Sequence, residues 1–322
     1  MTGITKIALI GAAAACLGFG VANAQAPAQA PAAAPADGAA KPDPNRTPWP
    51  PFQITDHMWY VGGANLGAYI LKTNKGLILV NTGFPYNTPM LEKTIADAGF
   101  DLKDIKILLI SHAHIDHDGG MPDIIKATGA KYYVMEGDAD VVESGGKLDY
   151  HYYAKPSEYY EPTHVDKVLH DGDTVTLGDL TLTAHLTPGH TKGDTTWTFM
   201  DTMNGKPRHV VIVGGPLLNG GGPNPLINNP RYPNIVADYR KAFAVMRSLP
   251  VDVYVGAHGY YFDLPTKYAK LQAGDKEAFE DPEGYKAFTD KAEANFNKAL
   301  AKQEAEAAGG AAPAAPAPAA AP

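Results

Sequence analysis

The stretch SHAHIDHDGG, residues 111–120, decides both the fold and the chemistry that we expect of this chain. Three histidines and an aspartate fall within six positions of it, directly after the apolar run of residues 105–110. Neutral imidazole and carboxylate are ligands that zinc accepts readily. The apolar run predicts a buried strand, and Gly119-Gly120 predicts a turn at its end.

The side chains of this stretch are expected to converge. Along an extended strand end, His112 and His114 point the same way, and Asp116 and His117 reach a neighbouring point. This spacing suits two adjacent metal ions better than one. The alternative is a solvated, histidine-rich loop or a tag-like metal binder, but such dense clustering directly after a strand disfavours it.

Two further histidines stand beside glycine at predicted strand ends. His190 lies in TPGHTKGD, residues 187–194, and His258 lies in VGAHG, residues 255–259. Each alone is more typical of a structural loop histidine. Together with the cluster they complete six ligands, which divide into two sets of three with room for water at each. Structural or surface roles are expected for the histidines at other strand and loop positions, His57, His164, His170, His185 and His209.

Residues 1–24 have the pattern of a secretory signal peptide: Lys6, an apolar stretch over residues 7–21, and Ala22-Asn23-Ala24 before a cleavage point. The stretch is short and rich in alanine and glycine, which disfavours a transmembrane anchor. A lipoprotein signal usually has leucine where Ala13 stands. We expect cleavage after Ala24, a periplasmic protein and no stable membrane insertion. The only cysteine, Cys16, is lost with the segment, so no thiolate ligand remains.

Composition predicts one large domain between two tails. The chain has 322 residues, of which 45% are hydrophobic, and a net charge of −8, so nucleic acid is not an expected partner. Residues 25–48 and 309–322 are rich in alanine and proline and predict a disordered linker and tail. Between them, residues 49–308 predict an α/β domain of two packed β-sheets flanked by helices. The expected strands are residues 68–71, 77–80, 105–110, 131–135, 174–177, 180–186, 194–200, 209–213 and 251–255, and the expected helices are residues 88–98, 121–128, 235–248 and a final one capped by Asp281. The final helix is expected to carry one apolar stripe, formed by Tyr285, Phe288, Ala292, Phe296 and Ala299.

The motif His-x-His-x-Asp-His resembles the mark of the metallo-β-lactamase superfamily, whose fold is an αβ/βα sandwich. Within that superfamily the chain is most similar to the third (B3) subclass of metallo-β-lactamases. The similarity rests on TPGHT at 187–191, NPRYP at 229–233 and DPEGY at 281–285. It implies two Zn²⁺ ions per chain, the first held by His112, His114 and His190, and the second by Asp116, His117 and His258.

The resemblance also implies an activity. A zinc-bound hydroxide would hydrolyse the amide bond of a β-lactam antibiotic without an acyl-enzyme, conferring resistance, and Asp116 would orient that hydroxide as the catalytic residue. A small-molecule β-lactam is therefore the expected partner of a monomeric enzyme. Two alternatives stay open. One is a zinc hydrolase of a lactone or thioester on the same fold, and the other is a non-catalytic zinc-binding protein.

Two departures from the family pattern bear on these alternatives. Residues 213–216 read VGGP, without the bridging aspartate that thioester, lactone and nuclease members usually carry there, and without the serine that the B3 subclass often has near Pro216. The first absence disfavours the alternative substrates, and the second leaves recognition of the lactam carboxylate open. Asn81 stands where the superfamily usually has aspartate. An asparagine can hydrogen-bond a ligand histidine without charge, so we expect altered zinc affinity.

Three further features allow an interpretation. The tyrosines between Tyr150 and Tyr160 form either a wall over the zinc site or a loop packed on its own rings. Residues 220–224 predict a mobile glycine-rich loop near the site, whose backbone N–H groups could replace the missing serine. Trp59 is expected in the core.

Overall fold

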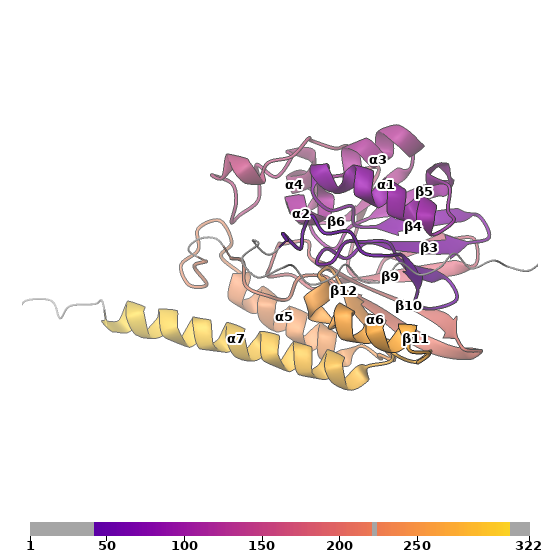
Figure 1. Cartoon of the computed structure of the whole chain (residues 1–322). Coiled ribbons are helices and arrows are strands. Elements are labelled where there is room, and N and C mark those ends of the chain that lie inside the picture. Colours follow the sequence, from indigo (N-terminus) through magenta and orange to yellow (C-terminus); the bar gives the residue numbers. More distant parts are fainter. Residues whose placement is uncertain (1–41, 221–223, 310–322) are drawn as a thin grey trace, which may run out of the picture. The chain divides into compact units, whose positions relative to one another are not determined.

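The computed structural model describes residues 42–220 and 224–309 (Figure 1). The predicted signal peptide and the predicted tail beyond residue 309 lie outside these ranges. Within them, no helix combines the length and the apolar character needed to cross a membrane.

Two β-sheets carry the fold. The first sheet has seven strands in sequence order, antiparallel from β1 to β4 and parallel from β4 to β7. Its strands are β1 (Phe52–Gln53), β2 (Met58–Tyr60), β3 (Tyr69–Thr73), β4 (Gly76–Val80), β5 (Ile105–Leu109), β6 (Lys131–Met135) and β7 (Lys167–Leu169). The second sheet has the order β12-β11-β10-β9-β8, with only β11 and β12 parallel. Its strands are β8 (Thr174–Leu177), β9 (Leu180–Leu186), β10 (Thr195–Met203), β11 (Lys206–Val213) and β12 (Val253–Gly256).

The helices lie outside these sheets. They are α1 (Thr88–Asp97), α2 (Ile115–Asp118), α3 (Met121–Thr128), α4 (Ala139–Glu143), α5 (Ile235–Ser248), α6 (Leu264–Gln272) and α7 (Pro282–Gly309). Short 3-10 turns lie at Pro85–Asn87, Leu102–Asp104, Pro156–Glu158 and Gly259–Tyr261. Figure 1 shows α1 and α3 over the first sheet, and α5, α6 and α7 on the side of the second sheet.

Strand alternation explains this layering. In β3 and β4, Leu71 and Ile78 belong to the core between the two sheets, whereas Ile70 and Leu79 pack under α1 and α3. Successive strand residues point to opposite faces, so a strand that is apolar at every position is covered on both sides. The predicted sandwich of two sheets flanked by helices is therefore confirmed.

The final helix follows its predicted pattern. The Asp281 carboxylate accepts a hydrogen bond from the Gly284 N–H at 2.8 Å, which caps the first turn of α7. Tyr285 and Ala292 of the predicted apolar stripe are buried, and Phe296 packs on Tyr239 of α5 with ring centroids 4.9 Å apart. The stripe thus fixes α7 along α5.

One predicted boundary differs. Residues 42–48 were expected in the disordered linker, yet they contact the domain. The Asn45 carbonyl accepts a hydrogen bond from Asn87 Nδ2 at 2.8 Å, and the Asn45 side chain accepts one from Asn65 Nδ2 at 2.7 Å. Pro48 forms a bridge with Gly63. These polar contacts order the segment although its composition resembles a linker.

Candidate metal centre

Strand ends from both sheets meet at one place and bring the predicted ligands together. β5 ends at Leu109, just before the histidine cluster, the loop after β9 carries His190, and His258 follows β12. The sheets are joined here, because the Thr195 N–H donates to the Ser111 carbonyl at 2.7 Å and Trp197 Nε1 donates to the Ile110 carbonyl at 2.9 Å. These bonds fix the backbone directly before His112.

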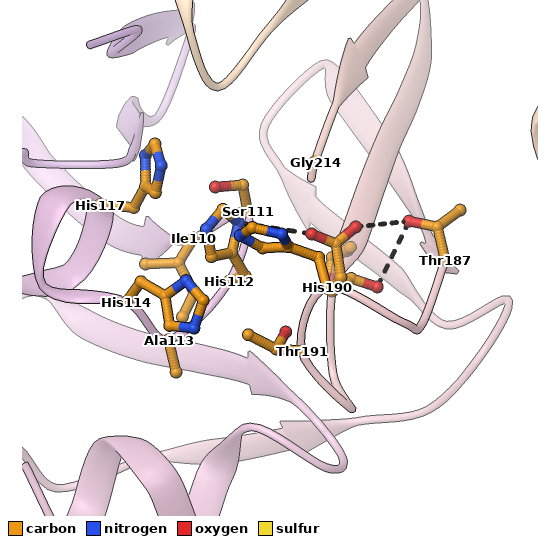
Figure 2. A network of polar contacts seen from close by, with 12 residues as sticks. Ile110, Ser111, His112, Ala113, His114, His117, Thr187, His190, Thr191 and Gly214 are labelled. Carbon is orange, nitrogen blue, oxygen red and sulfur yellow. Dashed lines mark hydrogen bonds and ion pairs between the residues drawn. The ribbon is translucent and has the colours of Figure 1, made fainter. Parts of the chain in front are cut away.

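His112, His114 and His190 form a first triad. Each offers one ring nitrogen, and these three atoms lie within 4.8 Å of one another. The ring centroids are 4.9 Å apart for His112 and His114, 4.6 Å for His112 and His190, and 4.9 Å for His114 and His190. Figure 2 shows the three rings converging from different directions. Such a cluster can hold one cation.

The outer nitrogens of this triad face acceptors. His190 Nδ1 lies 2.7 Å from the Leu217 carbonyl, and His114 Nε2 lies 3.4 Å from Asp149 Oδ2. A ring N–H at each of these nitrogens leaves the other nitrogen, His190 Nε2 and His114 Nδ1, as the one that can bind a metal.

Asp116, His117 and His258 form a second triad. Asp116 Oδ2 lies 3.3 Å from His117 Nε2 and 3.7 Å from His258 Nε2, and the two nitrogens are 3.2 Å apart. The same atoms of Asp116 and His117 also lie within 4.8 Å of a His112 nitrogen, so the two triads are neighbours. All six predicted ligands are thus assembled in one centre.

The protonation states favour a cation. Burial lowers the pKa of His112 well below its usual range and lowers the pKa of His190 and His258 to about 3. These rings are therefore neutral and offer lone pairs. Burial alone would raise the pKa of Asp116, but His117 and the neighbouring histidines outweigh it, so that its pKa is lowered and it stays a carboxylate. Neutral imidazoles and a carboxylate are the donors that zinc takes.

The family follows from comparison with known proteins. The family model described as the metallo-beta-lactamase superfamily matches residues 68–258. The chain belongs to this superfamily, and within it to the B3 metallo-β-lactamases. The native FEZ-1 metallo-β-lactamase from Legionella gormanii is 44% identical, with a TM-score of 0.79, over 82% of this chain and 99% of that one. The class B3 di-zinc metallo-β-lactamase LRA-12 from an Alaskan soil metagenome is 33% identical, with a TM-score of 0.75, over 81% of this chain and 97% of that one.

Curated relatives match over shorter stretches. A hydroxyacylglutathione hydrolase from Erythrobacter litoralis is 34% identical over 83 residues, which are 26% of this chain and 25% of that protein. The curated relatives are matched over only 25% to 39% of their own length.

Several buried carboxylates at this B3 centre were not predicted as site residues. Asp138 accepts hydrogen bonds from the Ala113 N–H at 2.9 Å, from Thr191 Oγ1 at 2.8 Å and from the Gly193 N–H at 2.8 Å. It therefore ties the loop of the first two histidines to the loop of His190. Burial raises its pKa to about 6. The sequence contains no signal for this role, because the two backbone N–H groups and the Thr191 hydroxyl that contact Asp138 are brought together only by the fold.

Asn81 has a different role from the one predicted. Its Oδ1 accepts a hydrogen bond from the Ser111 N–H at 2.8 Å, and its Nδ2 donates to the Gly67 carbonyl at 3.2 Å. None of its hydrogen bonds among the described residues reaches a ligand histidine, so that expectation was wrong. Asn81 instead fixes the backbone before His112, with a positive φ of 64° that asparagine tolerates better than most residues.

The aromatic segment combines both interpretations. The hydroxyls of the buried Tyr150 and Tyr160 donate to the carbonyls of Gly189 and Ala113, beside the ligands His190 and His114. These rings are packed loop interior. The ring of Tyr152, in contrast, lies against His114 with centroids 4.9 Å apart and forms a wall of the centre.

The glycine-rich loop predicted at residues 220–224 begins beside Tyr152, whose Oη donates a hydrogen bond to the Gly220 carbonyl at 3.2 Å. Residues 221–223 of this loop lie outside the described ranges. Trp59, which was predicted in the core, is half-buried and packs on Phe100 against the core beneath the helices of the first sheet. The five histidines predicted to have structural or surface roles contact partners outside the two triads: Asp201 for His57, Glu143 for His164, Glu136 for His170, Thr198 for His185 and Asp252 for His209.

Proposed function

We propose that this chain is a dizinc β-lactamase that hydrolyses the amide bond of β-lactam antibiotics and confers resistance to them. The observation that carries the proposal is the pair of complete, adjacent triads, one of three imidazoles and one of two imidazoles and a carboxylate. The similarity to FEZ-1 and to the di-zinc LRA-12 supports both the reaction and the metal.

The first zinc would be held by His112, His114 and His190, and the second by Asp116, His117 and His258. Bound zinc supplies Lewis-acid polarisation and a water of lowered pKa at neutral pH. The donor sets fit this ion, because they contain the nitrogen and carboxylate ligands it prefers, and the lowered pKa values of His112, His190, His258 and Asp116 keep these four in the metal-binding form.

Asp116 is the residue of the centre that can act on the attacking water. Its side chain is 25% exposed, whereas the neighbouring His117 side chain is wholly buried. A partly exposed carboxylate at this position can accept a hydrogen bond from the attacking water and thereby orient a lone pair of the water oxygen towards the lactam carbonyl. The lowered pKa of Asp116 keeps it an acceptor.

Two tyrosines flank the centre, one packed against each triad. Tyr152 packs on His114, and Tyr260, which is 60% exposed, packs on His258 with ring centroids 5.1 Å apart. The half-buried ring of Tyr152 and the exposed ring of Tyr260 offer apolar walls for a bicyclic substrate, and Asp116 itself is partly exposed.

The expected signal peptide extends the proposal to location. Residues 1–24 would direct export to the periplasm, where β-lactams reach their targets, and the cysteine-free ligand set suits that oxidising compartment.

The test is hydrolysis of a carbapenem and a cephalosporin by the purified protein, followed by ultraviolet absorbance before and after EDTA and after zinc is added back. We expect turnover that EDTA abolishes and zinc restores. Asp116→Asn should lose most turnover, whereas Asp201→Asn, which changes a buried carboxylate beside His57, should keep it. Two bound zinc ions without lactam turnover would contradict the proposal. Turnover of a lactone or thioester would then assign the alternative substrate class, for which the partial match to a hydroxyacylglutathione hydrolase is the supporting observation.

A further inference from the structure

Asp194 is a wholly buried carboxylate directly before β10. Its Oδ1 accepts a hydrogen bond from Thr187 Oγ1 at 2.8 Å. Its Oδ2 lies 3.3 Å from His112 Nδ1, and both of these atoms are buried without a hydrogen bond to any other side chain of the described residues. The Gly215 backbone also contributes a hydrogen bond to this carboxylate. Among side chains, however, Asp194 Oδ2 and His112 Nδ1 form a pair, because leaving either buried atom unpaired would cost free energy.

The glycines after β11 make room for this pair. A Cβ added to Gly214 would lie 2.4 Å from Asp194 Oδ1, and one added to Gly215 would lie 2.8 Å from Asp194 Oδ2 and 2.8 Å from His190 Cδ2. A side chain at either position would therefore collide with the carboxylate. The sequence VGGP at 213–216 lacks both a carboxylate and a serine, and the structure gives the reason: Asp194 enters that space from the neighbouring strand β10.

The position of the carboxylate determines what it can do. It faces Nδ1 of His112, which leaves Nε2 of that ring as the nitrogen that can bind a metal. A carboxylate that accepts the Nδ1 proton fixes the tautomer of the ring, so that Nε2 presents its lone pair, and increases the basicity of that nitrogen.

We propose that Asp194 is the positioning residue of His112, supplied from the position directly before β10 in place of a side chain after β11. His112 is the ligand residue that lies within reach of both triads, so its orientation affects the whole centre. The inference rests on the proposed metal centre, but it concerns metal affinity and does not depend on which acyl bond is hydrolysed.

The test compares Asp194→Asn with Asp201→Asn by titrating the metal-free proteins with Zn²⁺ against a chromophoric chelator. Asparagine keeps an acceptor for Thr187 but turns an NH₂ group towards His112 Nδ1, which favours the tautomer with its proton on Nε2. We expect Asp194→Asn to weaken zinc binding about 10- to 100-fold. Asp201 is a matched control, since it is a buried carboxylate on β10 that contacts a histidine, His57, outside the centre. Its variant should bind zinc within about twofold of the wild type.

Two further readouts separate positioning from a structural role. Metal-free Asp194→Asn should melt no lower than the wild type, because asparagine keeps the acceptor for Thr187 and removes a carboxyl whose ionisation burial opposes. Its Co²⁺-loaded form should show altered ligand-field bands, and those of Asp201→Asn should be unchanged. If Asp194→Asn fails to fold, Thr187→Val removes the hydrogen bond to Asp194 without changing its charge, and it should also weaken zinc binding.

Unchanged zinc affinity and unchanged Co²⁺ bands in Asp194→Asn, or in Thr187→Val if the first variant does not fold, would overturn the inference. An equal loss of affinity in Asp201→Asn would do the same. Failure of the proposed function is a separate outcome, since wild-type protein that binds zinc but does not hydrolyse lactams leaves the affinity comparison intact.

Discussion

Replacement of Asp118 by asparagine should change the pH dependence of stability in the metal-free protein. Asp118 ends α2, is wholly buried, and accepts a hydrogen bond from the Tyr132 hydroxyl at 2.5 Å. Burial raises the pKa of its carboxyl to about 7 from an ordinary value of 3.8. Between about pH 4 and pH 7 the unfolded chain therefore releases this proton before the folded protein does, and the carboxyl's contribution to stability is lost as pH rises through that window.

The size of the effect follows from the shift. A change from 3.8 to about 7 is roughly three pKa units, which at 1.36 kcal/mol per unit is at most about 4 kcal/mol. Asparagine has no proton to lose. It keeps an acceptor for Tyr132, and its NH₂ group can donate to the Tyr160 hydroxyl, which itself donates to the Ala113 carbonyl. We therefore expect Asp118→Asn to gain stability relative to the wild type as pH rises.

Urea unfolding in EDTA, at pH 4.5 and at pH 8, measures this difference. EDTA is needed because a cation at His117 would change the charge balance of the adjacent carboxyl. The gap in unfolding free energy between variant and wild type should widen by about 3 kcal/mol between the two pH values, since the carboxyl of the unfolded chain is already mostly ionised at pH 4.5. A gap that stays constant within about 0.5 kcal/mol would refute the reasoning, because it would mean that Asp118 ionises alike in both states.

Two other substitutions test how the centre is built. His258→Ala removes a donor from the second triad and leaves the first intact, so metal analysis should find one zinc per chain where the wild type has two. The control His57→Ala should keep both ions. Two tightly bound ions in His258→Ala would contradict the ligand assignment. Asn81→Asp keeps the acceptor for the Ser111 N–H but turns a carboxylate oxygen towards the Gly67 carbonyl. Urea unfolding should therefore show a loss of about 1–3 kcal/mol in the free energy of unfolding. A variant as stable as the wild type would show that the amide donor is not needed.

The parts of the fold that the sequence predicted are those with a local pattern. The run before the histidine cluster is apolar because β5 is covered on both faces, and the stripe through Phe296 is apolar because one side of α7 packs on α5. The short strands were missed for the same reason. β1 and β2 have two and three residues, and β7 is exposed at two of its three positions, so none shows an alternation long enough to recognise.

The candidate site, like the fold, could be predicted from the sequence only in part. Its ligands could be predicted because each stands at a strand end in a short motif with glycine. The carboxylates behind them could not, because Asp138, Asp149 and Asp194 meet their partners only through the approach of distant loops. The same holds for Asn81, whose family position suggested a histidine partner, while the fold presents backbone groups to it.

Anomalous diffraction at the zinc absorption edge, from crystals of the zinc-loaded protein, tests the central claim most directly. We expect two anomalous peaks, one for a zinc ion bound by His112, His114 and His190 and the other for a zinc ion bound by Asp116, His117 and His258, with distances of about 2.0–2.2 Å from zinc to its ligand atoms. A single peak at full zinc loading, or a peak bound by other residues, would contradict it.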